Sequence, residues 1–306
     1  MNNTKKILIL GVTASGKGTL GFELARYLHG EIISVDSMKV YRRMDIGTAK
    51  PSGEKQKLIP YHLIDVIEPS DSFSVDQFLD LTDRAVNNIQ DLQKPVIATG
   101  GTAMYIKALL YGLFNGPGSN LSIREKLKEA ISKEGLLSLY KRLSQIDPDA
   151  SERIHPNDEK RIIRALEVYE ITGKPISSFQ NQWSVPNKTE WFVIGLRREK
   201  ELENHRINMR VKKMVEQGLL DEVRSLLSES KPMSQQAAAA IGYAETIEHL
   251  NGKCNFEDAV EQIKINTRKF AKSQRTWFKT FRDVNWIDLD ENDTVESVLE
   301  KTLAII

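Results

Sequence analysis

The chain has 306 residues, of which 40% are apolar and 28% charged, so it can bury a sizeable core. The 43 Lys and Arg residues almost balance the 42 Asp and Glu residues, which excludes a uniformly basic protein and requires any basic surface to be local. The single cysteine cannot form an internal disulfide, and no stretch reaches the roughly 20 apolar residues that span a membrane. We expect a soluble, cytoplasmic protein.

Short apolar runs alternate with helical patterns in the first third of the chain. The first run, Lys6 to Leu10, reads as a buried strand and not as a leader, and a glycine-rich turn and a helical pattern follow it. Two β-rich runs occur at Glu31 to Val35 and Pro95 to Thr99, with a helical pattern over 75–92 between them. This alternation predicts an α/β fold with a P-loop NTPase-like parallel sheet flanked by helices.

The sequence pattern changes at a cluster of turn-forming residues from Asn115 to Ser119. Residues 124–143 and 158–172 read as charged amphipathic helices without strand signals. The apolar run Trp191 to Leu196 returns to the sheet, and long helices are predicted over 205–227 and 256–281. We predict a catalytic core formed by residues 1–117 and 200–306, with an all-helical insertion at 118–199.

The turn after the first strand matches most of a Walker A loop. Its G-x-x-x-x-G-K pattern lies between a strand and a helix, where backbone N–H groups and the helix N-terminus attract phosphate and Lys17 reaches the outer phosphate. The alternative is a degenerate loop kept for its turn. The predicted diphosphate- or nucleotide-binding residues are Gly11, Val12, Thr13, Ala14, Ser15, Gly16, Lys17, Gly18 and Thr19.

Gly18 departs from the Walker A pattern. A Ser or Thr hydroxyl usually holds magnesium at this position, so direct coordination by residue 18 is impossible here. Thr19, or water, is the predicted substitute contact to the metal.

A series of motifs follows the loop in order, and the matching stretch runs from about residue 7 to about residue 287. The motifs are SVDSMKVYR at 34–42, MDIGTAKP at 44–51, HLID at 62–65, GGTAMY at 100–105, RIHPND at 153–158, RALEV at 164–168, AIGY at 240–243, AKSQ at 271–274 and TWF at 276–278. Together they resemble the tRNA dimethylallyltransferase (isopentenylpyrophosphate transferase) family.

The resemblance implies transfer of a dimethylallyl group from dimethylallyl diphosphate to N6 of the adenosine 3′-adjacent to the anticodon, position 37 of tRNA, with release of diphosphate and Mg²⁺ as cofactor. It makes Asp36 the general base, places Thr102 at the reaction centre and gives Arg210 a contact to diphosphate, beside Lys17. Read without the resemblance, Asp36 and Thr102 are also suited to capping helices, and Arg210 to a solvated helix face.

Basic residues recur every three or four positions near the C-terminus, from Lys264 to Arg282, which places them on one helix face. Such a face is solvated by default, but its single sign favours contact with RNA phosphates. The resemblance implies a tRNA-contacting set of Asp36, Ser37, Met38, Lys39, Thr102, Arg124, Lys160, Arg161, Ile162, Ile163, Arg164, Ala239, Ala240, Ile241, Gly242, Tyr243, Ala244, Lys272, Ser273, Gln274, Arg275, Thr276, Trp277, Phe278 and Lys279. Ser273 and Ala244 depart from the common family pattern, which has a basic and a long polar residue there.

Two other functions are compatible with part of the sequence. An isopentenyltransferase acting on free adenine nucleotides would need neither the helical insertion nor the basic helix. An ATP-binding regulator or small-molecule kinase would explain the phosphate loop but not the motifs around Asp36, Thr102 and Arg164. The expected partners are the tRNA anticodon stem-loop and dimethylallyl diphosphate, with no membrane, and nothing requires more than a monomer.

Overall fold

A parallel sheet forms the centre of the fold in the computed structural model, which describes residues 5–113, 116–179 and 190–306. Within these residues six strands pair in the order β3-β2-β4-β1-β5-β6. The strands are β1 (Lys6–Gly11), β2 (Glu31–Val35), β3 (Tyr61–His62), β4 (Val96–Gly100), β5 (Trp191–Arg198) and β6 (Val284–Leu289). Every pairing is parallel, which confirms the predicted α/β fold class.

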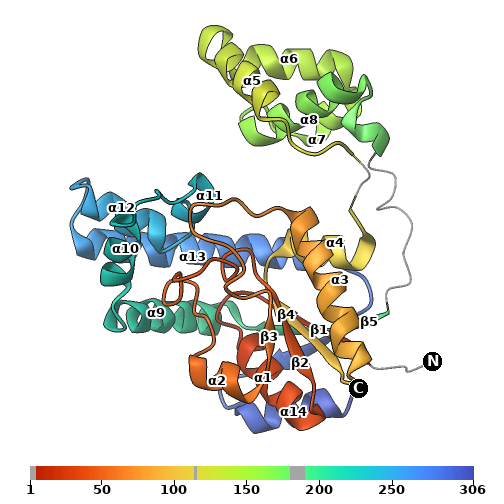
Figure 1. Cartoon of the computed structure of the whole chain (residues 1–306), viewed down its shortest axis with the longest axis vertical. Helices are drawn as coiled ribbons and strands as arrows, with labels where there is room; N and C mark the ends of the chain where they lie inside the picture. Colours follow the sequence, from red (N-terminus) through yellow and green to blue (C-terminus); the bar gives the residue numbers. More distant parts are fainter. Residues whose placement is uncertain (1–4, 114–115, 180–189) are drawn as a thin grey trace. The chain divides into compact units, whose positions relative to one another are not determined.

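Helices cover both faces of the sheet (Figure 1). On one side lie α1 (Lys17–Leu28) and α14 (Val295–Leu303), and their apolar side chains form one core cluster with Ile7 and Ile9 of β1. The other side is packed by α3 (Val75–Asp91) and α13 (Phe256–Phe278). The central strands are therefore apolar on both faces, which explains why they read as continuous apolar runs.

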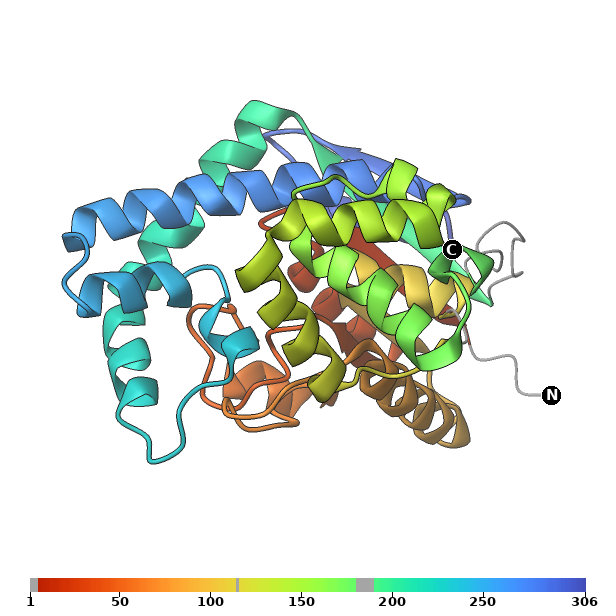
Figure 2. The ribbon, with the colours of Figure 1, turned by 90° about the horizontal axis from the view of Figure 1, so that it is seen from above.

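Further helices of this part of the chain lie around the sheet and the long helix α13 (Figures 1 and 2). They are α2 (Gly53–Leu58), α4 (Ala103–Tyr111), α9 (Lys200–Glu216), α10 (Leu219–Leu227), α11 (Gln235–Ala238) and α12 (Tyr243–Leu250). None of the helices in the described part of the chain has the length and apolarity that crossing a membrane requires.

The chain divides into two compact units, one of residues 1–110 and 189–306 and one of residues 111–188. The second unit contains α5 (Leu121–Glu134), α6 (Leu136–Ile146), α7 (Pro148–Arg153) and α8 (Glu159–Thr172). Its core is formed by apolar side chains from these helices, including Leu127, Leu143 and Leu166. The described residues of this unit form helices joined by loops, without a strand.

Three boundaries differ from the sequence-based prediction. The strand β5 pairs with β1 over six residues, so it belongs to the sheet, whereas the predicted insertion extended to residue 199. The predicted helices over 124–143 and 205–227 are each two helices. Each break lies at a glycine with positive φ, Gly135 at 82° and Gly218 at 96°, a conformation that favours glycine and ends a helix.

Candidate active site

The phosphate loop lies between β1 and α1 and closes on itself. Ser15 N donates to Val12 O at 3.2 Å, and Lys17 Nζ donates to the same carbonyl at 3.1 Å. Gly16 has φ 100°, which favours glycine, and a Cβ on Gly11 would lie 2.7 Å from Ser15 Oγ. The two glycines of the motif are therefore required by the shape of the loop itself.

Asp36 follows β2 directly and sits on a tight turn. Its Oδ1 accepts hydrogen bonds from Met38 N at 2.9 Å and Lys39 N at 3.3 Å. Its Oδ2 accepts none from the described residues. The turn fixes the carboxylate in place and leaves one oxygen for a ligand.

Thr102 follows β4, the strand beside β2, and is joined to the Asp36 turn. Its Oγ1 accepts a hydrogen bond from Ser37 N at 3.0 Å, and its own N–H donates to Val35 O at 3.4 Å. A Cβ on Gly100 would lie 2.0 Å from Val35 O, so only glycine permits this close approach of the two strands. Parallel strands thus bring Asp36 and Thr102 to one edge of the sheet.

Three cations surround the single carboxylate of Asp36. Burial, with a smaller contribution from neighbouring Arg210 and Lys39 and against the opposing effect of Asp36, lowers the pKa of Lys17 to about 7. Burial also lowers the pKa of Lys39 and of Arg210, in each case against the opposing effect of Asp36. This excess of positive charge on half-buried side chains is suited to a multiply charged anion.

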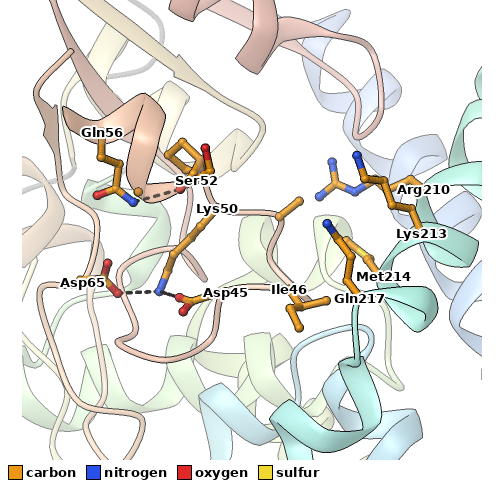
Figure 3. Close-up of a pocket in the computed structure, with 13 residues that line it drawn as sticks. Asp45, Ile46, Lys50, Ser52, Gln56, Asp65, Arg210, Lys213, Met214 and Gln217 are labelled. Atoms are coloured by element: carbon orange, nitrogen blue, oxygen red, sulfur yellow. Dashed lines mark hydrogen bonds and ion pairs between the residues drawn. The ribbon is translucent and has the colours of Figure 1, made fainter. Parts of the chain in front are cut away.

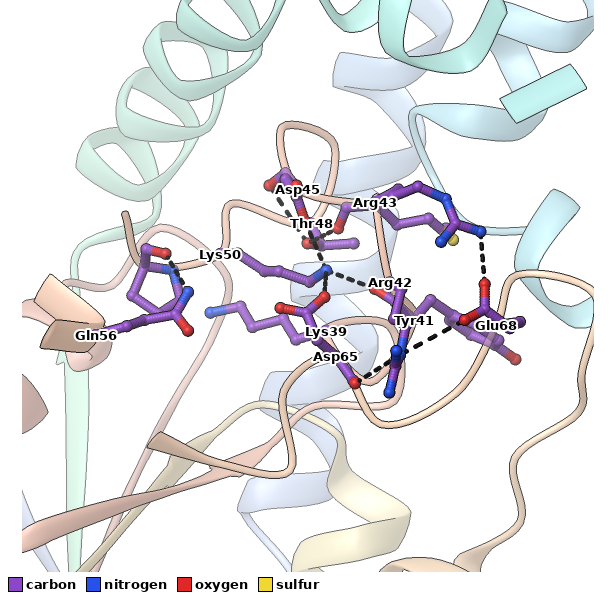
Figure 4. A network of polar contacts seen from close by, with 12 residues as sticks. Lys39, Tyr41, Arg42, Arg43, Asp45, Thr48, Lys50, Gln56, Asp65 and Glu68 are labelled. Atoms are coloured by element: carbon purple, nitrogen blue, oxygen red, sulfur yellow. Dashed lines mark hydrogen bonds and ion pairs between the residues drawn. The ribbon is translucent and has the colours of Figure 1, made fainter. Parts of the chain in front are cut away.

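A pocket of about 710 Å³ lies between α9 and the loop over 45–53, and Arg210 is part of its wall (Figure 3). Lys213 and Met214 line the same side. On the opposite side Lys50 is buried, with its Nζ 2.6 Å from one carboxylate oxygen of Asp45 and 2.6 Å from one of Asp65 (Figure 4). The ion pairs hold the loop that forms this wall.

Glu222 of α10 also holds this loop, and sequence reasoning did not identify it. Its carboxylate accepts from the N–H groups of Asp45 at 2.9 Å, Ile46 at 2.7 Å and Gly47 at 3.1 Å, and from the Tyr243 hydroxyl at 2.6 Å. A Cβ on Gly47 would lie 2.4 Å from the Tyr243 ring. The loop in turn contacts the site, because Arg210 Nη2 donates to Thr48 O at 3.4 Å.

The residues predicted to contact tRNA divide into exposed and buried groups. The exposed ones include Lys160 and Arg161 of α8 and Lys272, Ser273, Thr276 and Lys279 of α13 or its end. By contrast, the side chains of Ile162, Ile163, Ala240, Tyr243, Gln274 and Phe278 are at most 7% exposed. Their side chains pack or hydrogen bond within the protein, and the prediction that these residues contact tRNA stays a prediction.

Several predicted RNA-binding arginines have partners inside the protein. Arg124 and Arg164 both donate to Glu167, which is fully buried in the second unit. Arg275 donates to buried Glu203 of α9. These arginines therefore contribute to the stability of their helices.

A magnesium ion fits this site only with most of its ligands supplied from outside the protein. No cluster of three or more His, Cys, Asp or Glu side chains suited to a metal occurs in residues 5–113, 116–179 and 190–306. Mg²⁺ commonly binds through one or two protein oxygens together with phosphate and water. Thr19 is exposed on α1, so its predicted contact through water stays a prediction.

The family model and the similar proteins described below point to the same family. A family model described as "IPP transferase" matches residues 39–281. A tRNA dimethylallyltransferase from Geobacter metallireducens is 43% identical, covering 93% of each chain, and one from Alkaliphilus oremlandii is 42% identical, covering 96% of this chain and 94% of the other.

Solved structures agree with these relatives. The tRNA isopentenylpyrophosphate transferase from Bacillus halodurans has a TM-score of 0.70 at 36% identity, covering 98% of this chain and 96% of its own. A eukaryotic dimethylallyltransferase described as acting on tRNA has a TM-score of 0.81 at 29% identity, covering 99% of this chain and 78% of its own. The likeness extends over the sheet and the helices together.

Proposed function

The chain belongs to the IPP transferase family, and on that premise we propose that it transfers a dimethylallyl group from dimethylallyl diphosphate to N6 of adenosine 37 in tRNA, releasing diphosphate. The observation that supports this reaction best is the group of Lys17, Lys39 and Arg210 around one carboxylate, Asp36. The reaction needs positive charge to stabilise an anionic leaving group and a carboxylate to accept a proton, and this group of side chains contains both.

The cations act on the leaving group. As the bond between the allylic carbon and its oxygen breaks, negative charge grows on diphosphate, and Lys17, Arg210 and the amides of the phosphate loop stabilise it. Mg²⁺ bound with the diphosphate would supply further positive charge there, with Thr19 in contact through water. Because Lys17 and Arg210 are half-buried and held by hydrogen bonds to Val12 O and Thr48 O, little reorganisation is needed during the reaction.

Asp36 acts on the nucleophile. The N6 lone pair of adenine is delocalised into the ring, so removal of a proton as the N–C bond forms makes attack easier. Oδ2 of Asp36 accepts that proton, while the amides of Met38 and Lys39 hold Oδ1. Thr102, tied to the same turn through Ser37 N, orients the reacting groups.

RNA contacts would come from exposed basic side chains. We assign contacts with the phosphates of the anticodon stem-loop to Lys272 and Lys279 at α13 and to Lys160 and Arg161 of the second unit, because all four side chains are exposed. We further propose that one chain suffices for the reaction and that it acts in the cytoplasm on tRNA.

One assay separates this function from the alternatives. The protein is incubated with Mg²⁺ and dimethylallyl diphosphate together with unmodified tRNA, free AMP or ATP. Prenylated adenosine at position 37 of tRNA is expected, with none in AMP. Prenylation of AMP but not of tRNA would contradict the proposal, and ATP turnover without prenyl transfer would favour a kinase.

A further inference from the structure

Gln274 places a buried amide where the loops of the site meet. It lies on α13 and is 3% exposed. Its Oε1 accepts a hydrogen bond from Thr13 N at 2.8 Å, and its Nε2 donates to Gly101 O at 2.8 Å. One side chain therefore joins the phosphate loop after β1 to the turn after β4.

The geometry of this contact suits an amide. One partner is an N–H group and the other a carbonyl oxygen, so the side chain must accept and donate at once, as the planar carboxamide of Gln274 does at any pH near neutrality. A Cβ on Gly101 would lie 2.5 Å from Gln274 Nε2 and 3.4 Å from Lys17 Cε. The absence of a side chain at residue 101 thus leaves room for the Gln274 amide against the turn after β4.

The two hydrogen bonds of Gln274 connect it to the group that binds the donor and to the group beside the acceptor. On the donor side, Thr13 belongs to the loop that carries Lys17. On the acceptor side, Gly101 immediately precedes Thr102, whose Oγ1 accepts from Ser37 N beside Asp36. Displacing α13 along or about its axis would therefore disturb the donor and acceptor groups together.

The same helix carries the exposed cations proposed for RNA. Lys272 lies two residues before Gln274 and is exposed, and Lys279 follows the end of α13 and is exposed as well. Neither makes an ion pair with another described residue. A polyanion that binds these lysines would therefore act directly on the position of α13, the helix that carries Gln274.

We propose that Gln274 is a positioning residue that couples RNA docking on α13 to the arrangement of the phosphate loop and of Thr102. The proposal rests on the proposed function. Because coupling between two binding sites is reciprocal, RNA strengthens the binding of diphosphate and diphosphate strengthens the binding of RNA by the same factor. Gln274 carries this factor without touching either ligand.

The test measures inorganic diphosphate binding with and without tRNA, together with kcat and the dissociation constant for tRNA. The variants are Gln274→Glu, which keeps an acceptor for Thr13 N but sets oxygen against Gly101 O, and Gln274→Met, which removes both bonds. Thr267→Val is the matched control, since Thr267 is buried on the same helix and its hydroxyl donates only to Ile263 O within the described residues.

In the parent protein we expect tRNA to raise diphosphate affinity about fivefold or more. In both Gln274 variants that factor should approach one and kcat should fall about tenfold or more, while tRNA affinity alone changes about twofold at most. Thr267→Val should match the parent in every measurement. Should Gln274→Met lose its fold, Gln274→Glu, which has the same shape, decides the question.

Two results would overturn the proposal. One is a Gln274 variant that keeps both the coupling and kcat. The other is a variant that loses tRNA affinity but regains the parent kcat at saturating tRNA, because Gln274 would then be a simple RNA contact. A parent protein that binds diphosphate and tRNA cooperatively without prenyl transfer would refute the proposed function and still support the coupling.

Discussion

At the scale of single residues, the site holds more positive charge than its own groups can balance. Lys17, Lys39 and Arg210 are half-buried near one carboxylate, and partial removal from water lowers the pKa of all three cations. Removing water from unpaired charges costs free energy, which the packing of the fold must offset. An anionic ligand supplies the missing charge, so the site is arranged for diphosphate before the ligand arrives.

Replacing Asp36 by Asn should abolish most activity without altering the fold. Asn keeps an oxygen that can accept from Met38 N and Lys39 N, so the turn should persist. It cannot accept the N6 proton, and loss of a general base lowers kcat by about 100-fold or more. Single-turnover prenylation of tRNA measures the effect, with Tm and tRNA affinity as controls. A variant reacting at the parent rate would remove Asp36 from the chemistry.

The affinity for diphosphate should depend on pH through Lys17. Its pKa of about 7 in the free protein means that the amine loses its proton as pH rises through that value. Diphosphate binds the protonated form better, so affinity is full below about pH 7 and falls above it. Calorimetry should also detect proton uptake on binding at pH 8.

Lys17→Arg provides the control, because arginine stays charged across this range. The ionisation of diphosphate affects both proteins equally, so the quantity to compare is the ratio of the parent affinity to that of Lys17→Arg. We expect this ratio to fall between pH 6 and pH 8. A constant ratio would show that Lys17 keeps its proton throughout.

At the scale of elements, α13 uses its basic residues in two ways. Arg268 donates to Asn208 of α9 at 2.7 Å, and Arg275 donates to Glu203, which also belongs to α9. Burial raises the pKa of Glu203 while Arg275 opposes that shift. The two arginines thus join α13 to α9, whereas Lys272 and Lys279 stay exposed.

Replacing Lys272 and Lys279 together by Ala should weaken tRNA binding and reduce its salt dependence. Each phosphate contact contributes about 0.7 to 0.9 to the slope of log K against log salt, so the slope should fall by about 1.5. Filter binding over a range of salt concentrations measures it. Arg26→Ala with Lys57→Ala removes the same charge from α1 and α2 and should leave the slope unchanged. Equal slopes for both double variants would exclude α13 from the interface.

At the scale of the whole molecule, the two units have separate cores and separate stabilising contacts. In the second unit, Glu167 is fully buried and accepts from Asn120 N at 2.7 Å, Arg124 Nε at 2.8 Å and Arg164 Nη1 at 2.8 Å. Burial would raise its pKa, but the bonds from Arg124 and Arg164 outweigh that effect and lower it. Its contribution to stability is therefore present above the ordinary carboxyl pKa and lost as pH falls through the folded value.

Glu167→Gln should destabilise the second unit by about 3 kcal/mol, because the fully buried carboxylate that accepts from two half-buried arginines loses its charge. Glu170→Gln on the same helix breaks a surface pair with Arg142 and should cost about 1 kcal/mol at most. Hydrogen exchange followed separately in residues 116–179 and in the sheet measures the effect. We expect faster exchange in the helical unit alone; equal effects of the two variants would contradict the assigned role of Glu167.

Much of the fold and part of the site follow from local features of the sequence. Buried strands can be predicted from apolar runs because both faces of a parallel sheet are covered. The phosphate loop can be predicted from its glycines because other residues disfavour their backbone conformations. The short strand β3 and the half-exposed strand β6 were not predicted, since neither has a long apolar run. The split of the long helical patterns depended on the positive φ of Gly135 and Gly218.

The sequence by itself determined the phosphate loop, the position of Asp36 after a strand and the family motifs, because these depend on neighbours along the chain. Only the tertiary structure decided which motif residues are buried against other parts of the chain and which stay exposed. Gln274 reaches Thr13 across 261 positions and Gly101 across 173, and Tyr243 is buried against Glu222. A hydrogen-bond partner that distant leaves no periodic trace in the sequence, so a positioning residue and a binding residue look alike until the chain is folded.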